Sequence, residues 1–474
     1  MMEIEMTEHA AELHDRLPLM DATAMAGSLS RGEVSSYQLV MAHFDRIERY
    51  DAAGTTVVTP DRENALAAAR EADVLLARGK PGGSLHGIPV TIKDAFLTCG
   101  IRTTFGHPAF SDHIPLIDAA AVSMLKSAGA VLLGKTNCAT LCMDVQTVSP
   151  LFGTTSNPWD EERTSGGSSG GEAAAVALGL SPLGLGSDTA GSIRIPASYC
   201  GIYGFKPTVG KVPRQGLIPP MPETVDLDHH LTAVGPLARS VRDLLLCYRV
   251  LSGETAPETA RTRAPNVAWT ADFPGMPLDD EVGKVITRAV GCLRGNGISV
   301  EEKPSAIDMA KAVRSATALM YFEFFPFEKN EFLKKIFWKS LFTGGTFAYY
   351  KKLLDERMQL ADELDTFLEG WDCWLVPATP TTAPRHNPEK TPVSLIQNGK
   401  AKQIGYFSSA LSFTFPFNFT GHPAVVIPVG KDGNGLPVGV QLIGRRGGDV
   451  DLLQCAMSLV AALGDLPPGR PPKN

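Results

Sequence analysis

The chain has 474 residues, of which 44% are hydrophobic and 20% are charged, a composition typical of a globular protein with a large core. Its formal net charge of -7 argues against a nucleic-acid-binding surface. The acidic N-terminus lacks the residue order of a secretory signal, and the longest uncharged stretches, 173–187 and 408–421, are too short and interrupted to span a bilayer. We therefore expect a cytoplasmic protein without a transmembrane segment.

Cysteine and histidine give no sign of a disulfide framework or of a metal site. The eight cysteines are spread along the chain without a CxxC pair, which is typical of reduced and mostly buried thiols. The ten histidines show neither HxH nor HxxxH spacing. We expect no metal and no other cofactor.

Helices and strands alternate along the first part of the chain. Residues 34–51 place apolar side chains at helical spacing behind a serine cap and predict an amphipathic helix. Residues 86–94 form a short β-branched run bounded by Gly and Pro and predict a buried strand, which a helix at 119–129 and a strand at 131–134 follow. This alternation favours an α/β architecture.

The second part of the chain is less regular. Residues 254–266 lose apolar periodicity and predict a surface connection, and the pattern from 267 to about 370 is mostly helical, with its most aromatic part at 321–338. Strands return at 374–384 and 424–444, and a helix at 451–464 closes the chain.

Residues 129–136, GAVLLGKT, satisfy the GxxxxGK[ST] pattern of a nucleotide-binding P-loop. A P-loop needs an open, Gly-rich turn between a strand and a helix, whereas the spacer AVLL is apolar and β-prone. The predicted strand therefore lies inside the motif, which disfavours nucleotide binding.

Residues 166–170, GGSSG, fit the GxSxG nucleophile elbow of α/β-hydrolases. That elbow needs a strand directly before it, and the preceding residues 156–164 are predicted to form a polar loop. A triad would also need an acid and a histidine. Four histidines follow in the sequence without a distinctive setting: His229, His230, His386 and His422. A serine esterase is therefore a minor alternative.

A third pattern joins three separate places. Lys93 ends the strand GIPVTIK, Ser168 lies in TSGGSSGG, and Ser192 lies in SDTAGSIRIPASYCG. These blocks and their spacing strongly resemble the amidase signature family of Ser-cisSer-Lys amide hydrolases. The resemblance extends from the N-terminal helix to the closing strands and helix, and it is weakest between about 255 and 370.

The resemblance implies a single α/β domain over residues 1–474, whose mixed, twisted β-sheet is covered on both faces by helices. Within it we expect the core motifs at 86–245, a variable and mostly helical substrate-side region at about 255–370, and C-terminal strands with a helix at 371–465.

The resemblance also assigns the proton relay. Ser192 would be the nucleophile, and Ser168, preceded by a cis peptide bond at Gly167, would pass its proton to Lys93. Lys93 would have to be neutral to accept that proton, and burial of an ammonium group favours the neutral form.

The loop before the nucleophile would stabilise the transition state. The oxyanion donors would be three backbone N–H groups, those of Thr189, Ala190 and Gly191. Ala190 stands where family members often carry glycine. Asp188 and Arg194 would pin this loop, and Ser169 would support the network by hydrogen bonding.

The sequence says less about the substrate. Residues 149–159 and 179–188 locally resemble the fatty acid amide hydrolase branch, and the aromatic segment at 321–338 fits the wall of an apolar pocket, plain core or a membrane contact. We expect a small-molecule amide with an aryl or acyl-chain group, and a homodimer is compatible with the chain. The alternative is a subunit of a tRNA-dependent amidotransferase, although residues 218–233 differ from what such a protein leads us to expect.

Overall fold

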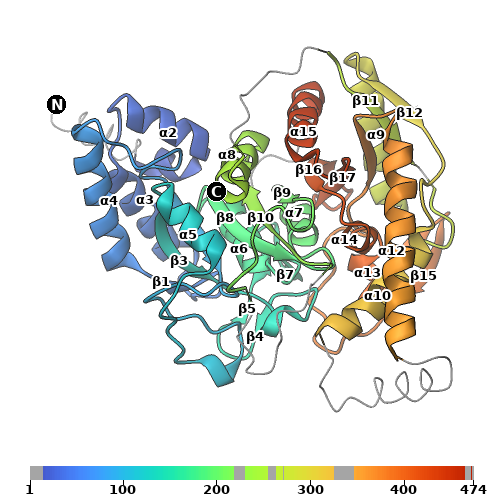
Figure 1. Cartoon of the computed structure of the whole chain (residues 1–474), viewed down its shortest axis with the longest axis horizontal. Coiled ribbons are helices and arrows are strands. Elements are labelled where there is room, and N and C mark those ends of the chain that lie inside the picture. The colour runs from blue at the N-terminus through green and yellow to red at the C-terminus, as the bar shows by residue number, and fades with distance from the viewer. Residues whose placement is uncertain are drawn as a thin grey trace.

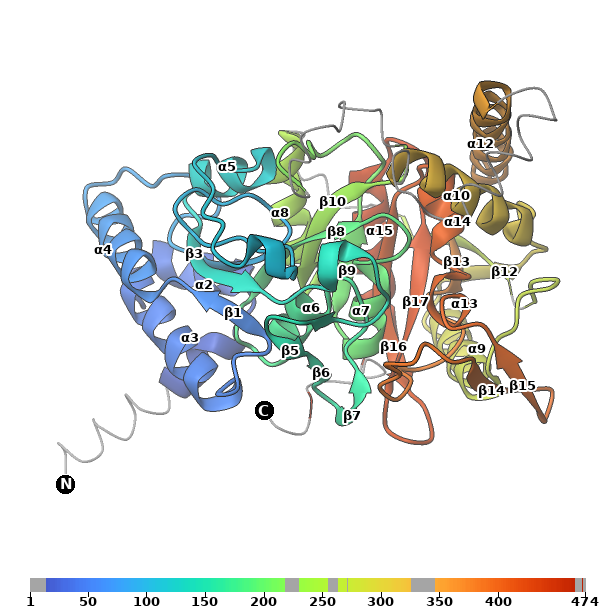
Figure 2. The same cartoon turned by 90° about the horizontal axis from the view of Figure 1, so that it is seen from below.

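The structure is a computed structural model, and one mixed sheet of eleven strands forms its centre (Figures 1 and 2). The strand order is β1-β3-β2-β8-β10-β9-β16-β17-β13-β11-β12. The residues that the structure describes are 14–217, 230–254, 263–270, 272–324, 346–464 and 471.

The strands of the main sheet are β1 (Val57–Pro60), β2 (Pro89–Lys93), β3 (Val131–Thr136), β8 (Leu183–Asp188), β9 (Tyr203–Lys206), β10 (Ala233–Ala238), β11 (Asn266–Trp269), β12 (Ser299–Glu302), β13 (Cys373–Pro377), β16 (Ala424–Lys431) and β17 (Pro437–Ile443). The short outer strands are β4 (Val148–Ser149), β5 (Gly153–Thr154), β6 (Ser156–Asn157), β7 (Asp160–Thr164), β14 (Val393–Gln397) and β15 (Lys400–Ile404).

The helices are η1 (Leu17–Leu19), α2 (Ala22–Ser30), α3 (Ser36–Tyr50), α4 (Arg62–Ala77), η2 (Pro108–Phe110), α5 (Ala120–Ser127), η3 (Thr140–Cys142), α6 (Gly170–Ala177), α7 (Arg194–Cys200), α8 (Val241–Ser252), α9 (Asp280–Gly295), α10 (Met309–Phe324), α12 (Thr346–Leu368), α13 (Ser408–Leu411), α14 (Phe415–Phe419) and α15 (Asp449–Leu463).

The sheet is parallel in two places and antiparallel elsewhere. β2 pairs in parallel with β3 and β8, and β11 pairs in parallel with β12 and β13. The remaining neighbours in the main sheet are antiparallel. The predicted α/β class with a mixed sheet is therefore confirmed.

Both faces of the sheet are buried under helices, as alternation along β16 shows. Val426 joins a core cluster with residues of α6 and α7, whereas Val425 and Ile427 join a larger cluster with residues of α8, α9 and α15. Successive side chains of a strand point to opposite faces, so these two groups of helices cover opposite sides of the sheet. Figure 1 shows α2, α3 and α4 at one end of the molecule and α9, α10 and α12 at the other.

The helix predicted at 34–51 is α3, and its start follows the expected capping chemistry. The Ser35 hydroxyl accepts a hydrogen bond from the Gln38 N–H, while the Gln38 side chain accepts one from the Ser35 N–H. This reciprocal pair satisfies two N–H groups that have no partner inside the helix.

The structure corrects two sequence predictions. The pattern of residues 267–370 predicts mostly helix, yet β11 and β12 lie in this stretch, and only Val300 of β12 is buried, so no apolar alternation marks that edge strand. The pattern of residues 156–164 predicts a polar loop, yet β6 and β7 form a small hairpin there. Most of three predicted segments, at 254–266, 321–338 and 465–474, lies outside the described residues.

Candidate active site

Lys93 is the innermost member of the predicted relay. It ends β2 and is fully buried. Its Nζ donates to Ser168 Oγ at 2.7 Å and to Ser187 Oγ at 3.0 Å. No ion pair among the described residues involves Lys93. The amine is therefore held by hydroxyl groups, which accept its hydrogen bonds without requiring it to be charged.

Ser168 lies on the tight loop that precedes α6. It is fully buried, and the peptide bond between Gly167 and Ser168 is cis. A Cβ atom added to Gly167 would lie 2.8 Å from the backbone of Asp144 and Gln146. No side chain fits there without moving the backbone, which explains the glycine before this serine.

Ser192 lies on the loop between β8 and α7. Unlike Ser168 it is partly exposed. The N–H of Ser169 donates to the Ser192 carbonyl at 3.2 Å, which ties the two serine loops together. Among the described residues, no hydrogen bond joins the Ser168 and Ser192 hydroxyls. The sequence-predicted trio therefore gathers at one place, with one of its two links formed in this structure.

Asp188 organises the loop that carries Ser192. Its carboxylate accepts hydrogen bonds from the N–H groups of Gly191 at 2.8 Å and Ile193 at 3.2 Å. Arg194 donates to both oxygens of the same carboxylate, from Nε and Nη2 at 3.0 Å each. Burial raises the pKa of Asp188, but the Arg194 guanidinium outweighs burial and lowers that pKa to about 2.

Arg194 in turn fixes this loop to the C-terminal part of the chain. It is fully buried, and Nη1 donates to the Thr414 carbonyl at 2.8 Å and to Gln441 Oε1 at 2.9 Å. Nη2 also donates to Asn418, whose side-chain amide donates back to Asp188 Oδ1 at 2.8 Å. A buried guanidinium with all its bonds made holds the loop in one arrangement.

The backbone N–H groups predicted for the oxyanion hole are not equivalent. Gly191 adopts φ +132°, and its N–H is already bonded to Asp188. Among the described residues, the N–H groups of Thr189 and Ala190 have no acceptor. In this structure, therefore, Thr189 and Ala190 have free donors and Gly191 does not.

Three further side chains border the relay without having been singled out from the sequence for a functional role. Ser187 accepts a bond from Lys93, and Ser169 Oγ donates to the Ser187 carbonyl at 3.3 Å. Glu172 lies buried in the first turn of α6. Cys142 has the sequence setting of an inert packing residue, but it is partly exposed, and the Cys138 thiol together with Lys93 lowers its pKa.

The two competing motif matches lose support in the structure. Lys135 of the P-loop-like motif lies inside β3, fully buried, where its Nζ bonds to the Phe96 carbonyl and to Thr98. The hydroxyl of Ser168 meets Lys93 rather than a histidine.

The four histidines considered for an esterase triad give no support either. His229 lies outside the described residues. The other three bond elsewhere: His230 to Glu323, His386 to Ser156 and the Glu161 carbonyl, and His422 to Asp365.

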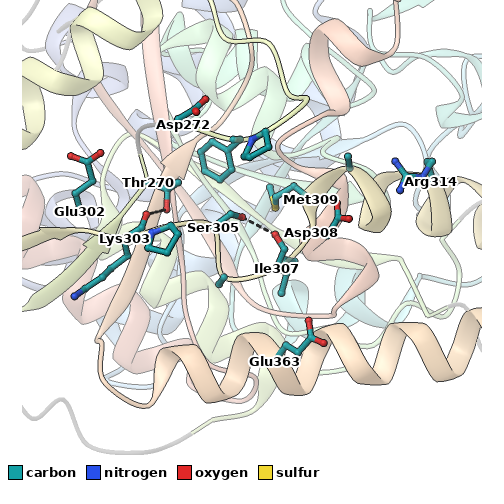
Figure 3. Close-up of a pocket in the computed structure, with 15 residues that line it drawn as sticks. Thr270, Asp272, Glu302, Lys303, Ser305, Ile307, Asp308, Met309, Arg314 and Glu363 are labelled. Atoms are coloured by element: carbon teal, nitrogen blue, oxygen red, sulfur yellow. Dashed lines mark hydrogen bonds between the residues drawn. The ribbon is translucent and has the colours of Figure 1, made fainter.

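A separate cleft of about 880 Å³ lies beyond the ends of β11 and β12, beside α10 and α12 (Figure 3). Its two hydroxyl groups that could act as nucleophiles are engaged: Thr270 donates to the Lys303 carbonyl, and Ser305 donates to the Ile307 carbonyl. The cleft therefore offers binding surface but no activated nucleophile.

Two searches of the described residues were negative. No helix among them is long and apolar enough to cross a membrane. No group of three or more His, Cys, Asp or Glu side chains in the same residues is arranged to hold a metal ion.

Comparisons with known proteins agree with this fold and site. A family model described as Amidase matches residues 38–453. A relative from Carboxydothermus hydrogenoformans, which is named as the A-type component of a glutamyl-tRNA(Gln) amidotransferase, is 35% identical over 92% of this chain and 96% of that protein.

Two solved structures are also similar. A crystal structure of an amidase superposes with a TM-score of 0.78 at 31% identity, covering 94% of this chain and 100% of that one. A fatty acid amide hydrolase gives a TM-score of 0.77, covering 96% of this chain and 86% of that one, and at 22% identity it shows the shared fold alone.

The fold and the cluster around Lys93 define a hydrolase that acts on C–N amide bonds. The chain belongs to the amidase signature family.

Proposed function

We propose that this enzyme hydrolyses a carboxylic amide through an acyl-enzyme on Ser192, with Ser168 and Lys93 as its proton relay. The observation that carries the proposal is the 2.7 Å hydrogen bond between Lys93 Nζ and Ser168 Oγ, fully buried beside a partly exposed Ser192. A dry lysine held by hydroxyls is suited to act as a base, because burial disfavours its charged form.

The proposed reaction runs in two halves. Ser192 Oγ attacks the amide carbon while its proton passes to Ser168 Oγ and the Ser168 proton passes to neutral Lys93. The C–N bond then breaks as Ser168 protonates the leaving amine and recovers a proton from the Lys93 ammonium. Water next attacks the ester through the same relay, releasing the acid and restoring Ser192.

The free N–H groups of Thr189 and Ala190 are the proposed oxyanion donors. They need no rearrangement, because no other group accepts from them among the described residues. Gly191 could contribute only after its N–H leaves Asp188. Asp188 and Arg194 are proposed to act by holding this loop rather than by touching the substrate.

We propose an apolar aryl or acyl-chain amide as the substrate, and we place its binding on the region of about 255–370 within the single domain. One apolar cluster supports this assignment: Ala190 and Leu231, which flank the nucleophile loop, share it with side chains of α10, α12 and α14. An apolar wall next to the oxyanion donors favours an apolar group on the amide.

The second candidate is a glutamine-hydrolysing subunit of a tRNA-dependent amidotransferase. It is favoured by the 35% identity to a component of such an enzyme. This candidate would act with partners, whereas the first proposal needs only a small-molecule amide, no nucleic acid, and the cytoplasmic chain alone or as a homodimer.

A turnover screen distinguishes the two. The purified chain is offered 4-nitroanilides of acetic, hexanoic, decanoic and phenylacetic acid, and glutamine, with Ser192→Ala as the blank. We expect turnover of the longer or aryl amides that the blank lacks. Turnover of glutamine alone, together with partner proteins recovered by affinity purification from the native host, would favour the amidotransferase. No Ser192-dependent turnover of any amide would contradict the proposed function.

A further inference from the structure

Glu172 is a fully buried carboxyl that the proposed mechanism does not use. It lies in the first turn of α6, four residues after Ser168. Both of its oxygens have partners: Oε1 accepts from the Thr91 hydroxyl, and Oε2 accepts from the Thr136 hydroxyl at 2.6 Å.

Its two partners are the nearest strand neighbours of Lys93. Thr91 precedes Lys93 by two residues on β2, so both side chains point to the same face of the sheet. Thr136 is the residue of β3 that pairs directly with Lys93. The carboxyl of Glu172 is therefore bonded to hydroxyls on either side of Lys93, along its own strand and across to the next.

The charge on Glu172 can change within the working range of an enzyme. Burial raises the pKa of Glu172 to about 7, against the hydroxyls of Thr136 and Thr91 and the positive charges of Lys135 and Lys93, which lower it. A change of that charge is felt strongly nearby, because charges interact more strongly in a buried setting than in water.

We propose that Glu172 is a positioning residue of the relay, whose carboxyl charge determines how readily Lys93 takes up and holds a proton. This inference rests on the proposed function. Ionised Glu172 stabilises the Lys93 ammonium, whereas protonated Glu172 leaves Lys93 neutral and ready to accept the proton of Ser168. Glu172 itself exchanges no proton with the substrate.

Other charged groups surround α6 and stay constant in the test. They are Lys93 and Asp94 of β2 and its end, Lys135 of β3, Asp188 of β8, Arg194 of α7, and Arg239 after β10, whose Nη1 donates to the Val176 and Ser181 carbonyls. The thiols of Cys138 and Cys142 lie beside Lys93.

The experiment is the pH profile of kcat/KM for Glu172→Gln with hexanoyl 4-nitroanilide between pH 5 and 10. At pH 5 the carboxyl is protonated in the native enzyme, so we expect a ratio of variant to native kcat/KM close to its value at pH 10, where Lys93 is neutral in both. Between these limits the ratio should rise up to about tenfold, and the variant should reach its plateau about one pH unit lower. A purely structural role would scale the profile without changing its shape.

Two further variants secure the interpretation. Thr136→Val removes a hydroxyl that stabilises the ionised carboxyl, so we expect a smaller change in the same direction, and this variant carries the test if Glu172→Gln does not fold. Asp243→Asn removes another buried carboxyl, one that bonds the start of α2, and should leave the profile shape unchanged.

The outcomes separate this inference from the proposed function. Absence of Ser192-dependent turnover in the native enzyme contradicts the function itself. Native turnover with parallel profiles for Glu172→Gln and Thr136→Val overturns only the role of Glu172.

Discussion

The catalytic cluster and the cleft beside α10 both contain charged side chains, but they treat charge in opposite ways. Lys93, Asp188 and Arg194 are fully buried, and each bonds to groups fixed by the backbone. The acidic side chains of the cleft face solvent: Asp272, Glu302, Asp308 and Glu363. Buried charge is costly unless its partners are in place, so the first region tolerates little change, whereas the second can vary.

The largest contrast should come from Lys93→Met. Without the base, kcat/KM for hexanoyl 4-nitroanilide should fall by about 10⁴-fold or more, as should that of Ser192→Ala, and the double variant should be no worse because the relay acts as a unit. Lys303→Met in the cleft is the control and should stay within about threefold. If Lys93→Met kept more than a tenth of native activity, the relay would have another base.

Next in size is the loss of stability in Arg194→Met, measured by urea unfolding. Removing the guanidinium leaves Asp188 buried without its charged partner, which typically costs about 3–5 kcal/mol. The matched control is Arg263→Met, whose pair with Asp372 lies at the surface with the arginine 65% exposed, and it should cost about 0–1 kcal/mol. Equal losses in the two variants would mean that burial does not separate these pairs.

The third effect is a pH dependence of stability from Glu172. Its pKa is about 7 in the fold, against 4.5 as the ordinary value, so between these values the folded chain holds a proton that the unfolded chain releases. The contribution of the protonated carboxyl is thus complete below pH 4.5 and is lost as the pH rises through 7, a change on the order of 3 kcal/mol. Unfolding of Glu172→Gln from pH 5 to 8 should lack this decline. A native and variant difference that is constant with pH would contradict the prediction.

The smallest effect should come from Glu363→Gln in the cleft. Its side chain is exposed, so the free energy of unfolding should change by less than about 0.5 kcal/mol. Affinity for an apolar anilide, measured as KM, should also stay unchanged, because the proposed apolar wall lies on the cluster shared with Ala190. A several-fold rise in KM would instead place substrate binding in the cleft.

The sequence was sufficient to locate the site where short patterns dictate backbone geometry. Two Gly-rich blocks and a strand lysine at fixed spacing indicated Lys93, Ser168 and Ser192, and the structure gathers them in one place. The helix at α3 and the strands β2 and β3 followed from capping and apolar periodicity. These features depend on residues close together in the chain.

What the sequence could not show depends on contacts between distant segments. A serine at the end of β8 carries no signal that it will meet Lys93, and a glutamate in a first helical turn looks like an ordinary solvent-facing acid. Whether Gly191 or Ala190 has a free N–H depends on where the Asp188 carboxylate folds back. The edge strand β12 is too short for its pattern to be distinguished from a helix.

The bonds of Arg194 also have a consequence for how the enzyme is made. Gln441, one of its partners, follows it by 247 residues, and Asn418 follows it by 224. A chain emerging from the ribosome contains Lys93, Ser168 and Ser192 long before it contains β17. The loop of the nucleophile therefore lacks two of its anchors until synthesis is nearly finished, which ties the first appearance of a reactive serine to completion of the polypeptide.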